Sequence, residues 1–344
     1  MNDTQAHVLE LLAASPAPVS GAGIGRTLGV TRSAVAQAVA GLRGLGYTIV
    51  STPHVGHHLL ARPDRLLAAE VTAGLHTRRL GQVVHAFDEV TSTQDVARAL
   101  ADGNAADGTL VVAERQSAGR GRLGRQFICP PGAIWCTLVM RGPLAVRVAP
   151  LVGLAAGVAV ARAIDAVTGL HTTLKWPNDV LVDGRKVAGI LTEATVEEQA
   201  VHYVLLGTGI NVNFSPSEFP PALRRTATTL AAACHGPVDR RALLQRYLLE
   251  LEPLWDRLLA ADAVPVVEGW RAHANLIGQR VRADLWGTSI EGVATRLDDS
   301  GALIIQPDAG AAVAVTVGDV QAVPALIGAG AHHRGKAKRG ERNA

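Results

Sequence analysis

The chain has 344 residues, of which 48% are hydrophobic and 18% charged, and its formal net charge is +3. These values are typical of a globular protein of two or three domains, and they argue against long disordered regions. No apolar run is long and uninterrupted enough to predict a membrane span. The basic excess lies at the end of the chain, where residues 332–344 hold five Lys or Arg and one Glu. We expect residues 326–344 to form a basic, disordered tail.

The cysteine content and the N-terminal sequence indicate the cellular compartment of the protein. Cys129, Cys136 and Cys234 have no metal-ligand spacing and form an odd, unpaired set. The N-terminal stretch MNDTQAHVLE lacks the basic start of a signal peptide. We therefore expect a cytoplasmic protein.

Residues 1–62 carry the pattern of three short helices followed by two strands. The helical segments are VLELLAAS, SGAGIGRTLGV and TRSAVAQAVAGLRGLG, and the strands are the two halves of YTIVSTPHVGHHLL around a Pro/Gly turn. Val35, Val39 and Leu42 recur at helical spacing and are expected to face a core. This order of elements predicts a winged helix-turn-helix domain.

Such a domain binds DNA in many proteins, although it also serves for interaction or dimerisation. Residues 1–60 carry three Arg and two acidic residues, and because phosphate contacts supply most DNA affinity, strong binding would need a dimer. The residues expected to face DNA are Thr31, Arg32, Ser33, Gln37 and Arg43, with His54, His57 and His58 on the wing.

The rest of the chain divides into three further regions before the tail. Residues 63–82 are polar and predict a helical connector. Residues 83–273 alternate strands and helices, with a buried apolar helix at 148–168 and a long helix at 239–260. Residues 274–325 alternate apolar and polar residues between turns at Trp286–Gly287, Asp299–Gly301 and Asp308–Gly310, which predicts a small SH3-like β-barrel.

The segment GRGRLGR (119–125) has the glycine spacing of a dinucleotide-binding turn. Such a turn must open into a helix, but here QFICPPG follows, and its two prolines block one. The H-R-D and D-F-G motifs of a kinase and the Gly-Lys-Ser/Thr ending of a P-loop are absent from the sequence. One copy without interleaved aromatics argues against an RNA-binding repeat. A clamp for a specific anion and a solvated surface loop remain.

A second group of polar residues lies in KWPNDVLVDGRKVAGIL (175–191). Asn178 and Asp179 follow a predicted strand, and Asp183-Gly184 predicts a tight hairpin that brings Lys186 back toward them. Asp179 could hold Mg²⁺ on a triphosphate, and Gly189 would let a ligand approach the backbone. The alternative for Lys186 is a solvated hairpin lysine.

Two shorter motifs are weaker by themselves. GTGINVN (207–213) places glycines and Asn211 at a strand end, where nucleotide contacts are common. TSTQ (91–94) offers hydroxyl and amide groups at a helix start, where capping of the helix is the simpler explanation.

In this order TSTQ, ERQSAGRGRLGR, KWPNDV, GRKVAGIL and GTGINV resemble the biotin protein ligase family. The flanking regions are similar to those of its bifunctional members, which also repress biotin synthesis genes. The resemblance implies a mixed-sheet biotin/lipoate ligase-like domain, formation of biotinyl-5′-AMP from biotin and ATP with Mg²⁺, and transfer to a lysine of the biotin carboxyl carrier domain of acetyl-CoA carboxylase. It also implies operator DNA as a partner and a homodimer when adenylate is bound.

The resemblance further implies roles for individual residues. The biotin-binding set is Ser92, Thr93, Gln94, Gln116, Arg120, Gly121, Arg122 and Lys186. The ATP-binding set is Arg122, Arg125, Asn178, Asp179, Gly189 and Asn211, with Asp179 on Mg²⁺. The catalytic residues are Lys186, Arg122 and Arg120.

Four positions depart from the family pattern. Gln94 stands where Asn is usual, Phe127 where Trp is usual and Cys129 where Ser is usual, and the recognition helix lacks a basic residue around Gln37. The last departure concerns operator affinity and leaves ligation untouched. Two alternatives remain open: a transcription factor that uses biotinyl-AMP mainly as corepressor, and a lipoate or octanoate ligase.

Overall fold

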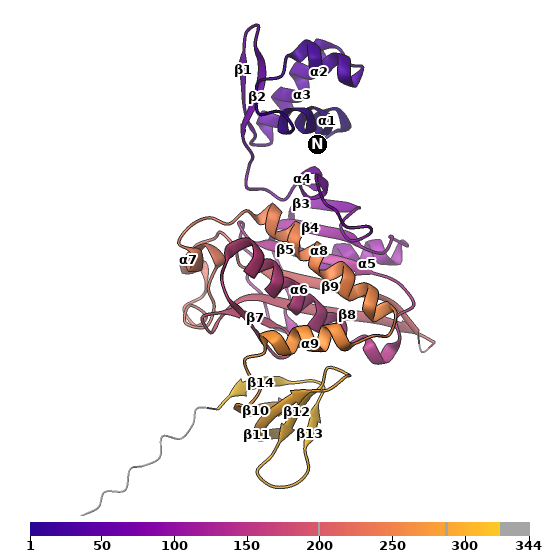
Figure 1. The fold of residues 1–344 in the computed structure, drawn as a ribbon, viewed down its shortest axis with the longest axis vertical. Coiled ribbons are helices and arrows are strands. Elements are labelled where there is room, and N and C mark those ends of the chain that lie inside the picture. The colour runs from indigo at the N-terminus through magenta and orange to yellow at the C-terminus, as the bar shows by residue number, and fades with distance from the viewer. Residues whose placement is uncertain (199, 286–287, 324–344) are drawn as a thin grey trace, which may run out of the picture.

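The computed structural model describes residues 1–198, 200–285 and 288–323, which form three bodies stacked along one axis (Figure 1). A small helical body with a two-stranded hairpin lies at one end, a seven-stranded sheet domain in the middle and a five-stranded sheet at the other end. The predicted basic tail and the predicted turn at Trp286–Gly287 lie outside the described residues.

The first body confirms the winged helix-turn-helix prediction. It consists of α1 (Asp3–Ala13), α2 (Gly21–Leu28), α3 (Arg32–Gly44), β1 (Thr48–Thr52) and β2 (Gly56–Ala61). Side chains of Asn2, Ser20 and Thr31 cap the three helices. Val35 and Leu42 are fully buried in its own core, as their spacing predicts.

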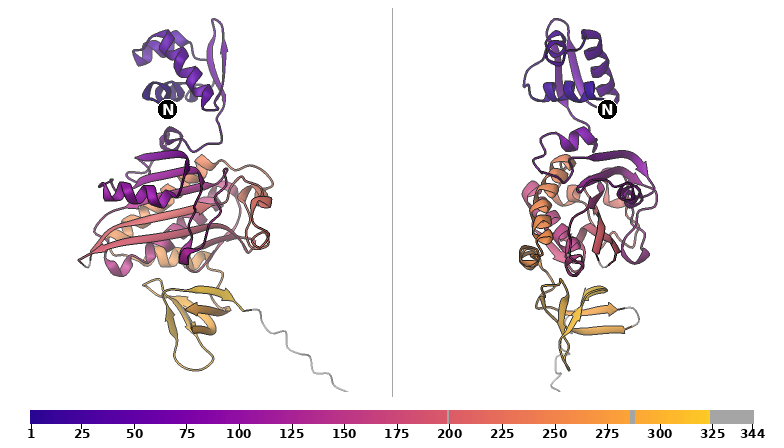
Figure 2. Two further views of the ribbon diagram at one scale, coloured as in Figure 1. Left: turned by 180° about the vertical axis from the view of Figure 1, so that it is seen from behind. Right: turned by 90° about the vertical axis from the view of Figure 1, so that its right-hand side faces the viewer.

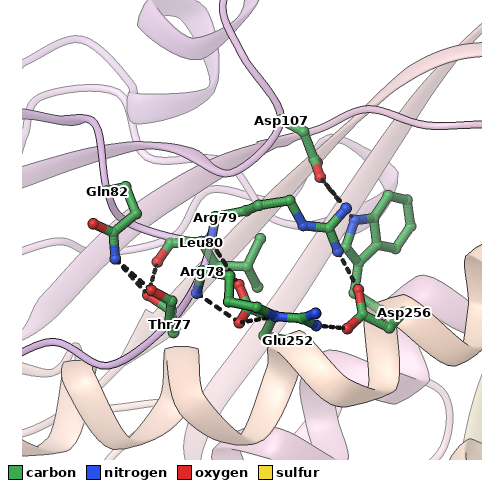
Figure 3. Close-up of polar contacts among 9 residues, drawn as sticks. Thr77, Arg78, Arg79, Leu80, Gln82, Asp107, Glu252 and Asp256 are labelled. Atoms are coloured by element: carbon green, nitrogen blue, oxygen red, sulfur yellow. Dashed lines mark hydrogen bonds and ion pairs between the residues drawn. The ribbon is translucent and has the colours of Figure 1, made fainter.

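The prediction of a helical connector is wrong for most of its length. Among residues 63–82 only α4 (Ala68–Thr72) is helical. The connector obtains its backbone hydrogen bonds elsewhere: the buried carboxylate of Glu252 accepts the N–H groups of Arg78 and Arg79 at 2.8 Å each and of Leu80 at 3.1 Å (Figure 3). Because these bonds reach a distant helix, local sequence could not reveal them.

The central sheet is mixed, and its strand order is β3-β4-β5-β9-β8-β7-β6. Among the strands that the structure describes in this sheet, β3 and β4 alone pair in parallel, so the domain is closer to α+β than to a regularly alternating α/β fold. The strands are β3 (Val84–Val90), β4 (Thr109–Gln116), β5 (Ile134–Met140), β6 (Thr172–Lys175), β7 (Asp179–Val182), β8 (Arg185–Glu197) and β9 (Ala200–Ile210).

Helices cover both faces of this sheet. On one face pack α6 (Leu151–Thr168), α8 (Arg240–Leu259) and α9 (Val264–His273) (Figure 2). On the other face α5 (Thr93–Asp102) packs against β4, β5 and β9 through Ala97 and Ala101. The short α7 (Leu230–Cys234) lies in the segment between β9 and α8.

Helix α6 is long and apolar enough to cross a membrane by length and composition, but 72% of it is buried inside the protein. It is the core helix that the sequence predicts. It begins at Leu151, three residues later than expected, because a short 3₁₀ turn and Pro150 precede it. It ends at Gly169, which adopts φ of 71°.

The last body is an antiparallel sheet, which bears out the predicted SH3-like domain. Its order is β13-β12-β11-β10-β14, with turns of positive φ at Gly301 and Gly310. The strands are β10 (Arg280–Leu285), β11 (Thr288–Leu297), β12 (Leu303–Gln306), β13 (Val313–Val315) and β14 (Asp319–Ala322). Its core is continuous with that of the central domain, and Trp176 Nε1 donates to Gly301 O at 3.0 Å. The two bodies are therefore firmly docked.

Candidate functional site

A cavity of about 500 Å³ opens in the central domain beside the arginine loop, residues 119–125. Every residue predicted above to bind biotin or ATP lines it. They are Ser92, Thr93, Gln94, Gln116, Arg120, Gly121, Arg122, Arg125, Asn178, Asp179, Lys186, Gly189 and Asn211. The structure thus brings together motifs that are spread over 120 residues of sequence.

The arginine loop is a hairpin that closes on itself. Phe127 N donates to Gly119 O at 2.9 Å and Gly121 N donates to Arg125 O at 2.7 Å. A Cβ on Gly119 would overlap Cys129 Sγ and lie 2.5 Å from Phe127 O, so glycine is required there. At the tip Leu123 adopts φ of 58°, a strained conformation for a leucine. Gly119 thus serves close packing, whereas Gly124, with φ of 71° and open space around it, serves the turn.

Each loop arginine is matched by a side chain from a different part of the chain. Arg120 pairs with Asp95 of α5 at 2.5 Å, and Arg122 Nη1 donates to Asn178 Oδ1 at 3.3 Å. Arg125 forms an ion pair with Asp319, the first residue of β14. Burial lowers the pKa of the Arg122 guanidinium, and the charges of Asp319 and Asp179 act in the opposite direction.

Lys186 and Asp179 meet across the predicted hairpin. The turn residues Asp183 and Gly184 adopt φ of 49° and 71°, and Lys186 Nζ lies 2.5 Å from Asp179 Oδ1. Nζ also lies 5.5 Å from the centroid of the Phe127 ring. A Cβ on Gly189 would lie 2.9 Å from Nζ, so the glycine makes room for the lysine.

The opposite end of the cavity holds neutral polar groups. Ser92 caps α5, as the simpler explanation of TSTQ required. Thr93 N and Oγ1 donate to Gln116 Oε1 at 2.7 and 3.0 Å, and Gln116 Nε2 donates to Cys129 Sγ at 3.0 Å. Burial raises the pKa of the Cys129 thiol to about 11, so it stays neutral. The Gln116 amide is therefore fixed in one orientation.

Two buried acceptors lining the cavity have no hydrogen-bond partner among the described residues: Gln94 Oε1 and Asn211 Oδ1. Gln94 Nε2 donates to Glu193 Oε2 at 3.1 Å, and Asn211 Nδ2 donates to Thr228 O at 3.2 Å. An unpartnered buried polar atom costs about 1–3 kcal/mol. A bound ligand that donates to these oxygens would remove that cost.

Several cavity residues were not predicted as binding residues from the sequence, and Phe127 was noted only as a departure from the family pattern. Phe127 and Trp135 stack edge to face at 5.7 Å, and a Cβ on Gly209 would lie 2.9 Å from the Trp135 ring. The scarcity of aromatic residues, 3% of the chain, could have drawn attention to this pair. Asp319 carries no local signal. The other lining residues not predicted include Leu181, Phe219, Leu223, Thr226 and Ala227.

The donor set for a metal ion is small. Among residues 1–198, 200–285 and 288–323, three or more His, Cys, Asp or Glu nowhere form a group that could hold a metal. Asn178 uses both of its polar atoms, because Nδ2 donates to Ile190 O at 2.9 Å and Oδ1 accepts from Arg122. Asp179 remains as a single carboxylate. It fits a Mg²⁺ ion that arrives on nucleotide phosphates and keeps its other ligands there.

The predicted DNA-facing residues divide into two kinds. Arg32, Ser33 and Gln37 are exposed on α3, and Thr31 Oγ1 accepts from Ala34 N at 3.1 Å as the helix cap. The Arg43 guanidinium instead donates to Ile49 O at 2.6 and 2.9 Å and to Ser51 Oγ. Arg43 therefore braces the wing against α3.

Three protein families match consecutive parts of the chain. An HTH domain matches residues 4–58, the Biotin/lipoate A/B protein ligase family matches residues 86–211 and the Biotin protein ligase C terminal domain matches residues 276–322. Each range lies within one of the three bodies of the fold, and the middle one covers the central sheet with α5 and α6 but ends before α7, α8 and α9.

Relatives of known function cover between 67% and 85% of the chain. The Bifunctional ligase/repressor BirA of Bacillus subtilis is 37% identical over 293 residues, which cover 85% of this chain and 90% of the relative. The Biotin--[acetyl-CoA-carboxylase] ligase of Mycobacterium tuberculosis is 38% identical, with 67% and 84% covered. The structure of Biotin protein ligase from Aquifex aeolicus in complex with biotin and ATP is 26% identical, has a TM-score of 0.62 and covers 70% of this chain and all of that chain.

Proposed function

This chain belongs to the biotin protein ligase family, in the form that carries an N-terminal helix-turn-helix domain, and from that membership we propose its reaction in detail. The enzyme activates biotin with ATP to biotinyl-5′-AMP and transfers the biotinyl group to a lysine of a biotin carboxyl carrier domain. The observation that carries the proposal is the shared cavity, in which Arg120, Arg122 and Lys186 lie together with the neutral polar groups of Thr93 and Gln116.

In the first step a carboxylate oxygen of biotin attacks the α-phosphorus of ATP, and the bond to the β-phosphate oxygen breaks to release pyrophosphate. Both reactants are anions, so their repulsion must be offset before they can approach in line. Lys186 and Arg122 supply fixed positive charge beside the reacting atoms. Little proton transfer is needed in this step, which agrees with a cavity whose charged groups are mainly cationic.

The neutral end of the cavity suits the ureido ring of biotin. Thr93 and Gln116 offer a fixed hydroxyl and amide, and Ser92 lies beside them. The free Gln94 Oε1 can accept a ureido N–H, so Gln94 can replace the usual Asn at this contact. A site built around such donors and acceptors rejects analogues that lack the partner group.

The other end suits the nucleotide. Asn211 Oδ1, buried and without a partner among the described residues, can accept from the amino group of adenine. Arg125 lies where it can reach the outer phosphates, and Asp179 can hold Mg²⁺ that accompanies them. When bound, this ion neutralises phosphate charge. Gly189 leaves space for the phosphates to approach the sheet.

In the second step the amine of the acceptor lysine attacks the acyl carbon of biotinyl-5′-AMP, the bond to AMP breaks and the amine gives up a proton. Asp179 is the nearest carboxylate to Lys186, at 2.5 Å, and can assist in removing that proton. Closure of the arginine loop over the adenylate excludes water and prevents its hydrolysis.

The helix-turn-helix domain supports a second function, repression of biotin genes. Arg32, Ser33 and Gln37 present exposed polar groups on α3, and a homodimer formed with bound adenylate would double the phosphate contacts. Operator DNA is then bound in the cytoplasm only when biotin is plentiful. Footprinting with and without biotinyl-5′-AMP tests this, and absence of protection in both states rejects it.

The test of the ligase function is biotin-dependent exchange of pyrophosphate into ATP with the full chain. We expect exchange with biotin and Mg²⁺, and none when biotin is left out. Exchange assays with lipoate or octanoate in place of biotin distinguish a biotin ligase from a lipoate or octanoate ligase. Exchange supported by octanoate but not by biotin would reject the proposal.

A further inference from the structure

We propose that Asp319 is a positioning residue of the nucleotide site: its carboxylate holds Arg125 while the site is empty and competes with ATP and pyrophosphate for that arginine. The inference rests on the proposed function and adds a residue of the C-terminal domain to it. Asp319 lines the cavity although it lies 128 positions after Leu191, the cavity's last residue of β8.

The first observation is the ion pair itself. Arg125 and Asp319 are joined across two domains, and their side chains are 64% and 31% exposed. A guanidinium binds carboxylates and phosphates through the same fork of N–H groups. The carboxylate of Asp319 therefore occupies a place on Arg125 that a phosphate oxygen would take. Because the pair is exposed to solvent, replacing one anion by another is not costly.

The second observation is that the two partners are held differently. Asp319 is the first residue of β14, which pairs with β10, and the neighbouring Val320 is 2% exposed in the core shared with the central domain. Trp176 and Gly301 join the two domains through a buried hydrogen bond. Arg125 lies at the end of an exposed loop. Asp319 is thus the fixed partner, and Arg125 is the one that changes partner.

The third observation concerns charge beyond the pair. Asp319 is the foremost of the acidic groups that act to raise the pKa of Arg122, against the effect of burial that lowers it. One carboxylate thus faces two arginines of the loop. Removing its charge leaves both of them more attractive to polyphosphate, and the largest gain is expected for ligands with several phosphate oxygens.

The consequence is an effect on release as well as on binding. Pyrophosphate must dissociate before the biotinyl group is transferred to the acceptor lysine. When the Asp319 carboxylate pairs again with Arg125, it accelerates the dissociation of pyrophosphate. Loss of this competition should strengthen ATP and pyrophosphate binding and leave biotin binding unchanged, since the ureido contacts of Thr93 and Gln116 lie at the other end of the cavity.

The experiment compares D319N, D319E and the matched control D308N in the full chain. Asp308 carries the same charge in the same domain, but it pairs with Arg280 at 2.5 Å away from the cavity. In biotin-dependent pyrophosphate exchange we expect D319N to lower KM for ATP and KM for pyrophosphate roughly threefold to fivefold. D319E and D308N should match the wild type, as should KM for biotin in all variants.

An unchanged or raised KM for ATP in D319N, with an unchanged KM for pyrophosphate, overturns the proposal. A change of the same size in D308N overturns it as well, because the effect would then be one of net charge. Calorimetric titration with inorganic pyrophosphate tests the competition without catalysis: equal affinity of wild type and D319N rejects it. If the wild type shows no biotin-dependent exchange, the proposed function fails, while the titration still decides about Asp319.

Discussion

Two arginine-rich segments of this chain meet carboxylates in different ways. In the connector, Arg78 and Arg79 face Glu252 and Asp256 of α8, and Arg79 Nη1 also lies 3.2 Å from Asp107 (Figure 3). Glu252 is 6% exposed and binds three backbone N–H groups at the same time.

The arginine loop has partners of another kind. Asp95 and Asp319, which pair with Arg120 and Arg125, have side chains 47% and 31% exposed, and they come from elements on different sides of the cavity. Ion pairing by itself thus does not separate a structural arginine from a ligand-binding one. The difference lies in whether the carboxylate is fixed by buried backbone groups and whether a cavity adjoins the pair.

The largest effect that this comparison predicts is on the cavity side, for Lys186→Ala. The substitution removes a fixed charge from the reacting atoms, and we expect biotin-dependent pyrophosphate exchange to fall by about 10²- to 10³-fold. The thermal midpoint of unfolding should be unchanged. Arg185→Ala is the matched control, since Arg185 is the adjacent cation and lies outside the cavity lining. Activity within a few-fold of wild type would remove Lys186 from the catalytic set.

Arg122→Gly tests the loop as a clamp. The half-buried guanidinium makes a charge-assisted contact, and such contacts contribute about 1.5–3 kcal/mol, so release of bound biotinyl-5′-AMP should accelerate by roughly 10- to 100-fold. A chase of labelled adenylate with unlabelled adenylate measures the rate. Arg79→Gly removes an arginine of the connector and should leave the release rate as it is. Equal release from wild type and Arg122→Gly would contradict the clamp.

Glu252→Gln tests the connector side. The amide places an N–H group where the carboxylate accepted one from the backbone, so the free energy of unfolding should fall by about 1–3 kcal/mol. Because Glu252 lies outside the cavity lining, KM for ATP and biotin should not change. Urea unfolding of wild type and variant measures the free energy of unfolding. If Glu252→Gln had normal stability but an altered KM, the connector would have to be assigned to ligand binding and not to structure alone.

Much of the fold could be predicted because its signals are local. Thr31 and Ser92 cap helices, Gly169 ends one, and Asp183-Gly184 forms the hairpin that brings Lys186 to Asp179. The connector could not be predicted, since its hydrogen bonds reach Glu252, more than 170 residues away. The polar composition of residues 63–82 predicts a helix, because the sequence does not show that the Glu252 carboxylate accepts their backbone N–H groups.

The site shows the same division. Short motifs identify 13 residues of the cavity lining from sequence, among them all of its loop arginines and Lys186. Asp319 could not be found, because its role depends on how the C-terminal sheet docks on the central domain. Arg43 is a related case: it is predicted to face DNA, and the structure adds that its guanidinium donates to a carbonyl of β1, a contact that local sequence does not reveal.

The smallest effect expected is a change in the acid dependence of stability. Burial acts to raise the pKa of Glu252, but the backbone N–H groups of Arg78, Leu80 and Arg79 and the charge of Arg78 outweigh it, and the pKa is lowered. A lowered pKa in the folded state means that this carboxylate stabilises the fold above the unfolded value of about 4.5 and ceases to do so as the pH falls through the lower, folded value. The free energy of unfolding should therefore decline less steeply below pH 5 in Glu252→Gln than in wild type. If the free energy of unfolding depended on pH equally in wild type and Glu252→Gln, the contacts of Glu252 would stabilise the connector no more than the exposed ion pairs stabilise the arginine loop.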